Sequence, residues 1–283
     1  MEDRAGTLGA FLAASRARVI PDASEQVGPA LRRVPGLRRE EIAVIAGVSA
    51  SYYTRLEQGQ AANASPQVLD ALARALRLGE VERDHLHTLA RAATRPVALT
   101  EPAEEQAGVG FREILAGLHD TPAMVLGRRR DILAWNSAGH QLFAPHLDAA
   151  DVDDDQRRPN ATAMIFLDPH MRDFYLDWEA KAIASAGNLR VLAARFPTDA
   201  RLLTLIGRLS VASDDFVRIW AAQSIGTSST ATYRVRHPVA GELALRQQLL
   251  TSDEIPGQSI VICTAVEGSS SGQALSLLGR LSV

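Results

Sequence analysis

Residues 36–59, GLRREEIAVIAGVSASYYTRLEQG, contain two short helical stretches joined by a tight turn. The first stretch keeps small residues on its inner side, the turn is Gly47-Val48-Ser49, and the second stretch ends at Gly59. This arrangement is typical of a helix-turn-helix, which places its second helix in the major groove of DNA. We therefore expect this segment to bind DNA, and the rest of the chain to decide when it binds.

Helical periodicity assigns roles to the residues of this segment. Ile42 and Leu56 are expected to face inward, and Ser49 is expected to cap the second helix beside the DNA-reading residues. Arg55 is the strongest candidate for reading bases, because a guanidinium binds O6 and N7 of guanine, although a phosphate contact fits it equally well. The remaining alternative is a surface pair with Glu57 or a nearby acid. The residues expected at base edges are Ala50, Ser51, Thr54 and Arg55, and those expected at phosphates are Arg39, Tyr52 and Gln58.

Helix signals also surround this segment. Ser65-Pro66 supplies an N-cap followed by proline at the first helical position. Residues 96–110 mix Pro, Gly and acids without a period, which is typical of a linker. The expected helices are residues 8–19, 38–46, 50–58, 65–78 and 80–93. The expected division is an all-α helix-turn-helix domain at 1–95, a linker at 96–110 and a second domain at 111–283.

The second domain mixes strands and helices. Residues 123–127 and 131–135 are expected to pair as a hairpin, and Asn136 is expected to cap the next helix. Further helices are expected at 171–196 (with a break at Gly187), 199–211, 214–223 and 273–281, and further strands at 231–236, 242–250 and 259–266. This order predicts an α+β, PAS-like domain with a five-stranded antiparallel sheet covered on one side.

Composition and charge fit a two-domain cytoplasmic protein. The apolar content is 46%, and the longest apolar runs, such as residues 259–266, are too short to span a bilayer. The N-terminus lacks the apolar stretch of a signal peptide, and the single cysteine, Cys263, fits a reducing compartment. Residues 1–96 hold 13 arginines against 11 acidic residues, whereas the remainder holds 17 basic against 22 acidic residues. That asymmetry suits a DNA-binding domain joined to a domain that avoids DNA. All of the cations except Lys181 are arginines.

Motifs that would indicate catalysis are incomplete. Residues 268–272, GSSSG, match the nucleophile elbow of a hydrolase, but no Asp, Glu or His follows them to complete a triad. The seven histidines lack metal-ligand spacing, and neither a phosphate-binding nor a dinucleotide fingerprint is present. We therefore expect no enzyme activity, no metal and no cofactor.

Long stretches of the sequence resemble a known family. GLRREEIAVIAGVSASYYTRLEQG followed by SPQVLDALARALRL is similar to XRE-class regulators, and more closely to the MmyB-like regulators of actinobacteria. The similarity continues through PAMVLGRRRDILAWNSAGHQLF, FLDPHMRDFYLDWEAKA, SDDFVRIWAAQ, RHPVAGELAL and ALSLLGRL, and so covers nearly the whole chain. One departure is LRQQLL at residues 245–250, where the family usually has an aromatic strand.

This resemblance implies a PAS-like C-terminal domain that holds a fatty-acid-like ligand, and a repressor or activator that binds DNA as a homodimer. Large aromatic residues could form the walls of a lipophilic cavity, although each one alone is more often plain core. A cation or amide at its mouth would bind an acyl carboxylate, although each candidate could equally be a surface charge, a cap or a turn. The candidates are Trp135, Asn136, Phe166, Trp178, Arg190, Phe216, Trp220 and His237.

Two functions remain in competition. The first is a sequence-specific transcriptional regulator that binds a palindromic operator in double-stranded DNA as a homodimer and responds to a small lipophilic ligand. The second is a ligand carrier or protein-interaction module whose N-terminal helices do not bind DNA. The two differ in whether the protein binds duplex DNA above the non-specific level.

Overall fold

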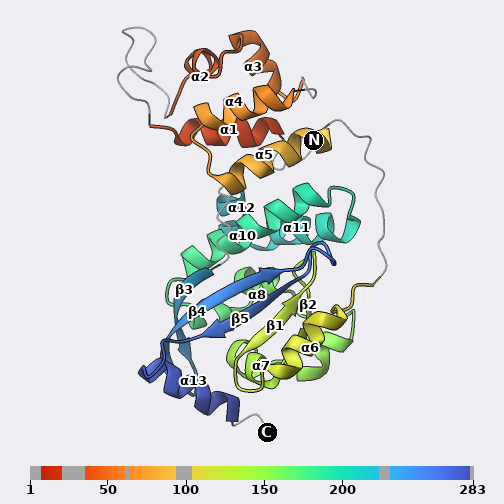
Figure 1. The fold of residues 1–283 in the computed structure, drawn as a ribbon, viewed down its shortest axis with the longest axis vertical. Helices are drawn as coiled ribbons and strands as arrows, with labels where there is room; N and C mark the ends of the chain where they lie inside the picture. The colour runs from red at the N-terminus through yellow and green to blue at the C-terminus, as the bar shows by residue number, and fades with distance from the viewer. Residues whose placement is uncertain (1–7, 21–35, 61–63, 94–103, 223–229, 281–283) are drawn as a thin grey trace.

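The chain folds into a helical N-terminal domain and an α+β C-terminal domain (Figure 1). The structure is a computed structural model that describes residues 8–20, 36–60, 64–93, 104–222 and 230–280, without the side chains of 81, 92, 93, 279 and 280. The N-terminal helices are α1 (Leu8–Arg18), α2 (Arg39–Ala46), α3 (Ala50–Glu57), α4 (Pro66–Ala75) and α5 (Glu80–Ala93).

The N-terminal domain has a single core to which all five helices contribute. Its fully buried members include Phe11, Leu12, Ile42, Leu56, Leu72 and Leu86. Gly9 of α1 lies directly against the end of α3, where an added Cβ would come within 2.3 Å of the Glu57 carbonyl oxygen. Glycine at this position therefore allows α1 to pack closely against the second helix of the motif.

The turn between α2 and α3 has the geometry that the sequence predicts. Gly47 adopts the left-handed conformation, with φ of 66°, at the end of α2. Ser49 then caps α3, and its hydroxyl accepts a hydrogen bond from the backbone N–H of Tyr52 at 3.1 Å. These two local features confirm the helix-turn-helix.

The C-terminal domain is built on a five-stranded antiparallel sheet with the order β2-β1-β5-β4-β3. Its strands are β1 (Ala123–Leu126), β2 (Ile132–Trp135), β3 (Thr230–His237), β4 (Gly241–Thr251) and β5 (Ser259–Thr264). Its helices are α6 (Val109–Gly117), α7 (Ser137–Phe143), the 3-10 helix η3 (Ala149–Asp153), α8 (Ala161–Leu167), α9 (Pro169–Phe174), α10 (Trp178–Arg195), α11 (Ala200–Ala212), α12 (Asp214–Ala221) and α13 (Ser270–Arg280). The predicted α+β architecture is confirmed.

Both faces of the sheet carry helices, which corrects the expectation that only one would. Met124 and Leu126 point toward the main core, which includes residues of α8, α9 and α10. The alternate residues Ala123 and Val125 point the other way and pack against Phe111 of α6. The sheet is therefore fully covered on one face and covered over its β2-β1-β5 part on the other.

The helical layer differs from the sequence prediction in two ways. The expected helix at 171–196 is two helices, because α9 ends at Phe174 and α10 begins at Trp178. Within α10 the expected break at Gly187 is absent. Ala182, Ala186 and Gly187 are buried, so the small residues let neighbouring helices pack closely on an unbroken helix.

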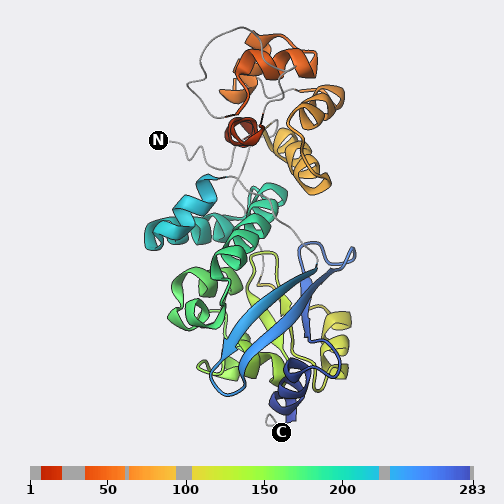
Figure 2. The ribbon, with the colours of Figure 1, turned by 90° about the vertical axis from the view of Figure 1, so that its left-hand side faces the viewer.

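The two domains meet where α5 packs against α10. Figures 1 and 2 both show the layer of α10 and α11 between the N-terminal domain and the sheet. The described part of the expected linker, from residue 104, belongs to the C-terminal domain: Gln258 donates to the carbonyl of Gln106 and accepts from the N–H of Gly108, and α6 already begins at Val109. Across the described residues, no helix has both the length and the apolar character needed to cross a membrane.

Candidate nucleic-acid interface and ligand cavity

The outer face of α3 gathers the residues that were expected to contact DNA. Those that are exposed are Ser49, Ala50, Ser51, Arg55 and Gln58, whereas Tyr52 and Thr54 are half-buried. The Thr54 hydroxyl donates to the carbonyl of Ala50 at 2.8 Å, so it is already engaged within the helix. Arg55 forms no ion pair with any described residue, and the alternative pairing with Glu57 is not what the structure has.

Glu57 instead binds two arginines at the base of the motif. Its carboxylate accepts hydrogen bonds from Arg16 at 2.9 and 3.1 Å and from Arg39 at 2.9 and 3.3 Å. Burial opposes ionisation of Glu57, whose side chain is 4% exposed, but hydrogen bonds from Arg16 and Arg39 outweigh it, and the pKa of the carboxyl lies below its ordinary value. Arg39, expected at a phosphate, is therefore held in place by Glu57 while its side chain stays 45% exposed.

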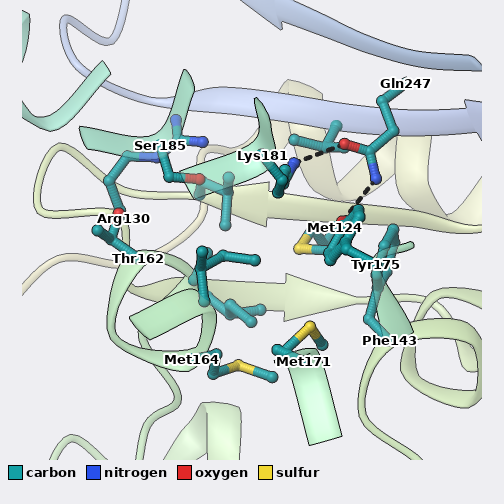
Figure 3. Close-up of a pocket in the computed structure, with 15 residues that line it drawn as sticks. Met124, Arg130, Phe143, Thr162, Met164, Met171, Tyr175, Lys181, Ser185 and Gln247 are labelled. Atoms are coloured by element: carbon teal, nitrogen blue, oxygen red, sulfur yellow. Dashed lines mark hydrogen bonds between the residues drawn. The ribbon is translucent and has the colours of Figure 1, made fainter. Parts of the chain in front are cut away.

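A cavity lies in the C-terminal domain between the sheet and the helices that cover it (Figure 3). Its volume is about 50 Å³. Apolar residues of both layers form most of the wall, among them Met124, Met164 and Met171. These are all of the methionines that follow Met1. Because methionine adapts its shape at little cost, the wall of this cavity can repack around an occupant.

Polar groups converge at one end of the cavity, opposite Met164 and Met171 (Figure 3). Lys181 of α10 donates to the side-chain oxygen of Gln247 at 2.7 Å. Gln247 of β4 in turn donates to the Tyr175 hydroxyl at 2.9 Å. Arg130 and Ser185 line the same cavity.

The two cations of the cavity have no acidic partner. Neither Lys181 nor Arg130 forms an ion pair with a carboxylate of any described residue. Burial lowers the pKa of Lys181 to about 8, with a further contribution from the charge of Arg130, although nearby Cys263 opposes the shift. Burial alone lowers the pKa of Arg130 to about 10. The cavity is therefore an electropositive site with apolar walls.

Backbone geometry directs Arg130 into this site. Arg130 occupies the turn between β1 and β2 with φ of 69°, a left-handed conformation that a residue other than glycine rarely adopts. Its N–H donates to the carbonyl of Gly127 at 2.9 Å, which closes the turn. A conformation of this kind costs about 1–2 kcal/mol, and such costs are typical of functional positions.

None of the eight residues expected to bind ligand lines this cavity. Four of them form a packed aromatic cluster in the helical layer, with ring centroids 5.1 to 5.9 Å apart: Phe166, Trp178, Phe216 and Trp220. These four side chains therefore belong to the hydrophobic core, which was the alternative to a place in the cavity wall. Trp135 of β2, another residue expected in the cavity wall, instead donates from its indole N–H to the carbonyl of Ala149 at 3.0 Å.

The three expected polar anchors are engaged by neighbouring groups. Asn136 caps α7 by accepting from Gly139, and its amide group donates to the carbonyls of Leu118 and Thr121. His237 accepts at Nδ1 from the N–H groups of residues 239 and 240, and its Nε2 contacts the carbonyl of Gln141 at 3.0 Å. Arg190 is only 2% exposed and lies outside the cavity.

The polar cavity residues that sequence reasoning missed come from four separate parts of the chain. They are Arg130, Tyr175, Lys181, Ser185 and Gln247. Two signals were visible in the sequence: Lys181 is the only lysine, and Gln247 belongs to the LRQQLL segment that departs from the family pattern. In the described part of the chain, no group of three or more His, Cys, Asp or Glu side chains is placed to hold a metal ion.

Two known families match different parts of the chain. Residues 7–86 match a family described as a helix-turn-helix domain. Residues 108–278, more than half of the chain, match the family described as the MmyB-like transcription regulator ligand binding domain. Both families are regulatory, one binding DNA and the other a ligand, and no curated protein matches the chain. The chain therefore belongs to the family of helix-turn-helix transcription regulators that carry an MmyB-like ligand-binding domain.

Proposed function

We propose that this regulator binds a palindromic operator as a homodimer in the cytoplasm, and that a small lipophilic acid in the cavity modulates its affinity for DNA. The observation that carries the choice of ligand is the pair of cations, Lys181 and Arg130, that line an apolar cavity without an acidic partner among the described residues. A carboxylate between them would restore the favourable interactions that both cations lose on burial.

The size of the cavity bears on the length of the ligand. A water-sized group needs about 10–15 Å³ on this scale, so about 50 Å³ accommodates a carboxylate and the first carbons of a chain. A longer chain requires Met164 and Met171, at the end opposite Lys181, to change rotamer. The fatty-acid-like ligand implied by the family is therefore accommodated in a repacked state of the cavity.

The eight residues around α3 remain our proposal for the DNA contacts. Arg55 is the base-reading residue in this proposal because it is exposed and its guanidinium is not engaged by any described acid. Arg39 contacts a phosphate while Glu57 fixes its orientation. The short residues Ser49, Ala50 and Ser51 allow the helix to approach the groove closely and contribute little base specificity of their own.

Selection of duplexes from a random pool, followed by gel shifts, tests the DNA-binding half of the proposal. We expect Arg55→Ala to lose about 1–3 kcal/mol of discrimination between the selected site and a single-base variant. Arg208→Ala, which removes an exposed arginine from α11 in the other domain, serves as the matched control and should bind as wild type does. If wild type binds every duplex with only the non-specific affinity of roughly 10⁻⁴–10⁻⁶ M, the regulator proposal is overturned.

Calorimetry with acids of increasing chain length tests the ligand half. We expect butyrate, hexanoate and octanoate to bind with increasing affinity, because burial of each added methylene contributes about 0.8 kcal/mol to the binding free energy. Octanol, which has the same chain as octanoate without its charge, should bind at least tenfold more weakly. Equal affinities for the acid and the alcohol would exclude an anionic head group.

A further inference from the structure

One helix spans the distance between the cavity and the DNA-binding domain. α10 lines the cavity with Lys181 and Ser185 in its first half, and contacts the N-terminal domain through its second half. Ala194, in its last turn, is buried within the core cluster of the N-terminal domain. At 1.5 Å per residue, Lys181 and Ala194 lie roughly 20 Å apart along the helix axis.

His85 is a buried residue of α5, the helix that packs against α10. His85 is 3% exposed, and the ring of Phe11 meets it edge-on with centroids 5.1 Å apart. Neither ring nitrogen of His85 has a hydrogen-bond partner among the described residues. Arg190 of α10 lies close enough for its charge to oppose protonation of this imidazole. A shift of α10 would therefore change the surroundings of His85 directly.

Arg190 also fixes α10 to the rest of the C-terminal domain. Its guanidinium donates to the carbonyl of Trp220 on α12 and lies 4.3 Å from the centre of the Trp220 ring. Ala182 and Ala186 of α10 are fully buried, so the helix packs directly against its neighbours. Closely packed elements of this kind move between discrete arrangements as rigid bodies.

We infer that α10 is the mechanical link through which occupancy of the cavity alters the docking of the DNA-binding domain, with Arg190, His85 and Ala194 forming the coupling contact. This inference rests on the proposed function for the identity of the ligand, an acid bound at Lys181. The connection between the cavity and the DNA-binding domain rests only on the contacts of α10. The docking contact joins α5 to α10 and leaves the outer face of α3 exposed, so the ligand acts on the placement of α3 rather than by covering it.

Reciprocity of coupling provides the test, because a change in docking must alter ligand affinity by the same factor as the ligand alters docking. Ala194→Arg introduces a long cation into the α5–α10 contact, next to the Arg190 charge. Ala212→Arg makes the same substitution at an exposed position at the end of α11 and serves as the control. Octanoate affinity is measured by calorimetry on the three full-length proteins. We expect at least a fivefold change for Ala194→Arg and less than a twofold change for Ala212→Arg.

Hydrogen exchange of the α5 amides supplies a second readout. In wild type, octanoate should change the exchange rate at residues 80–93 at least threefold, and Ala194→Arg should abolish that response. If octanoate binds with equal affinity to all three proteins and leaves α5 unchanged, the link is overturned while the ligand proposal stands.

If octanoate does not bind wild type at all, the acid ligand of the proposed function fails and the link is decided without a ligand. Lys181→Met then perturbs the cavity end of α10 directly. A threefold change in exchange at residues 80–93 would support the link, and unchanged exchange would overturn it.

Discussion

The two domains differ in whether their clustered cations have an acidic partner. In the N-terminal domain, Glu57 pairs with both Arg16 and Arg39 through hydrogen bonds of 2.9 to 3.3 Å. In the C-terminal domain, Lys181 and Arg130 line a cavity, and no described acid pairs with either. Each arginine of the first cluster has a carboxylate partner, whereas the two cations of the second have none among the described residues. In our proposal, the charges of the first cluster support the fold and those of the second bind a ligand.

The largest expected effect on stability comes from removing the charge of Glu57, which pairs with Arg16 and Arg39. Glu57→Gln keeps the shape of the side chain but removes the charge that both arginines face. We expect a loss of about 2–3 kcal/mol in the free energy of unfolding, below the usual cost of breaking a buried pair because Arg39 is 45% exposed. Chemical denaturation of the full-length protein measures it, with Glu40→Gln at an exposed position of α2 as the control. A loss below 0.5 kcal/mol, a threshold typical of surface changes, would refute the cluster's structural role.

Removing the cation Lys181 from the cavity should stabilise the protein rather than destabilise it. Lys181→Met should raise the unfolding free energy by about 2 kcal/mol near neutral pH and abolish binding of carboxylates. Because burial lowers the pKa of Lys181 from 10.5 to about 8, the charged side chain destabilises the fold fully below pH 8. That penalty disappears as the pH rises from 8 toward 10.5. The difference in unfolding free energy between the variant and wild type should therefore shrink over this range. A variant less stable than wild type at pH 7 contradicts this prediction.

The contact between the domains should weaken in acid. Burial, with a contribution from the Arg190 charge, lowers the pKa of His85 from 6.5 to about 4. An undocked His85 with its ordinary pKa would take up a proton below pH 6.5 while the docked one would not, so each pH unit between 6.5 and 4 should cost docking up to about 1.4 kcal/mol. Hydrogen exchange at residues 80–93 measures this loss. His85→Leu should remove the pH dependence, and its persistence in that variant would assign it to another group.

A neutral hydrogen bond sets the lower end of the scale. Ser49→Ala removes the cap of α3 and should cost about 1 kcal/mol of unfolding free energy. Arg55→Ala, on the exposed face of the same helix, should change stability by less than 0.5 kcal/mol. Equal effects of the two variants would show that the cap contributes nothing specific.

The features that sequence predicted best depend on neighbouring residues. Gly47 and Ser49 set the turn and the cap within a few positions, and Ser65 with Pro66 begins α4 in the same local way. Asn136 caps α7 as predicted, because an N-cap needs only the N–H groups of the next turn. Local chemistry of this kind is visible without knowledge of the fold.

The cavity was missed because its residues converge from distant parts of the chain. Lys181 and Gln247 lie 66 positions apart and meet only because α10 packs on the face of β4. Large aromatic residues such as Trp178 and Phe216 were expected in the cavity because size suggests a wall, but their area makes them equally suited to the core that they fill. The one useful local signal was the uniqueness of Lys181 in a chain whose other cations are arginines.

That uniqueness allows a direct test of the unpaired cation. Protein labelled with ¹³C at the lysine side chain should give a single lysine Cε signal, whose titration by NMR reports the pKa of Lys181. We predict a pKa of about 8 in the ligand-free protein and a clear increase when octanoate is added, because a carboxylate favours the charged form. A pKa near 10.5 without ligand, or one that octanoate leaves unchanged, would contradict the claim that the cavity holds an unpaired cation that binds a carboxylate.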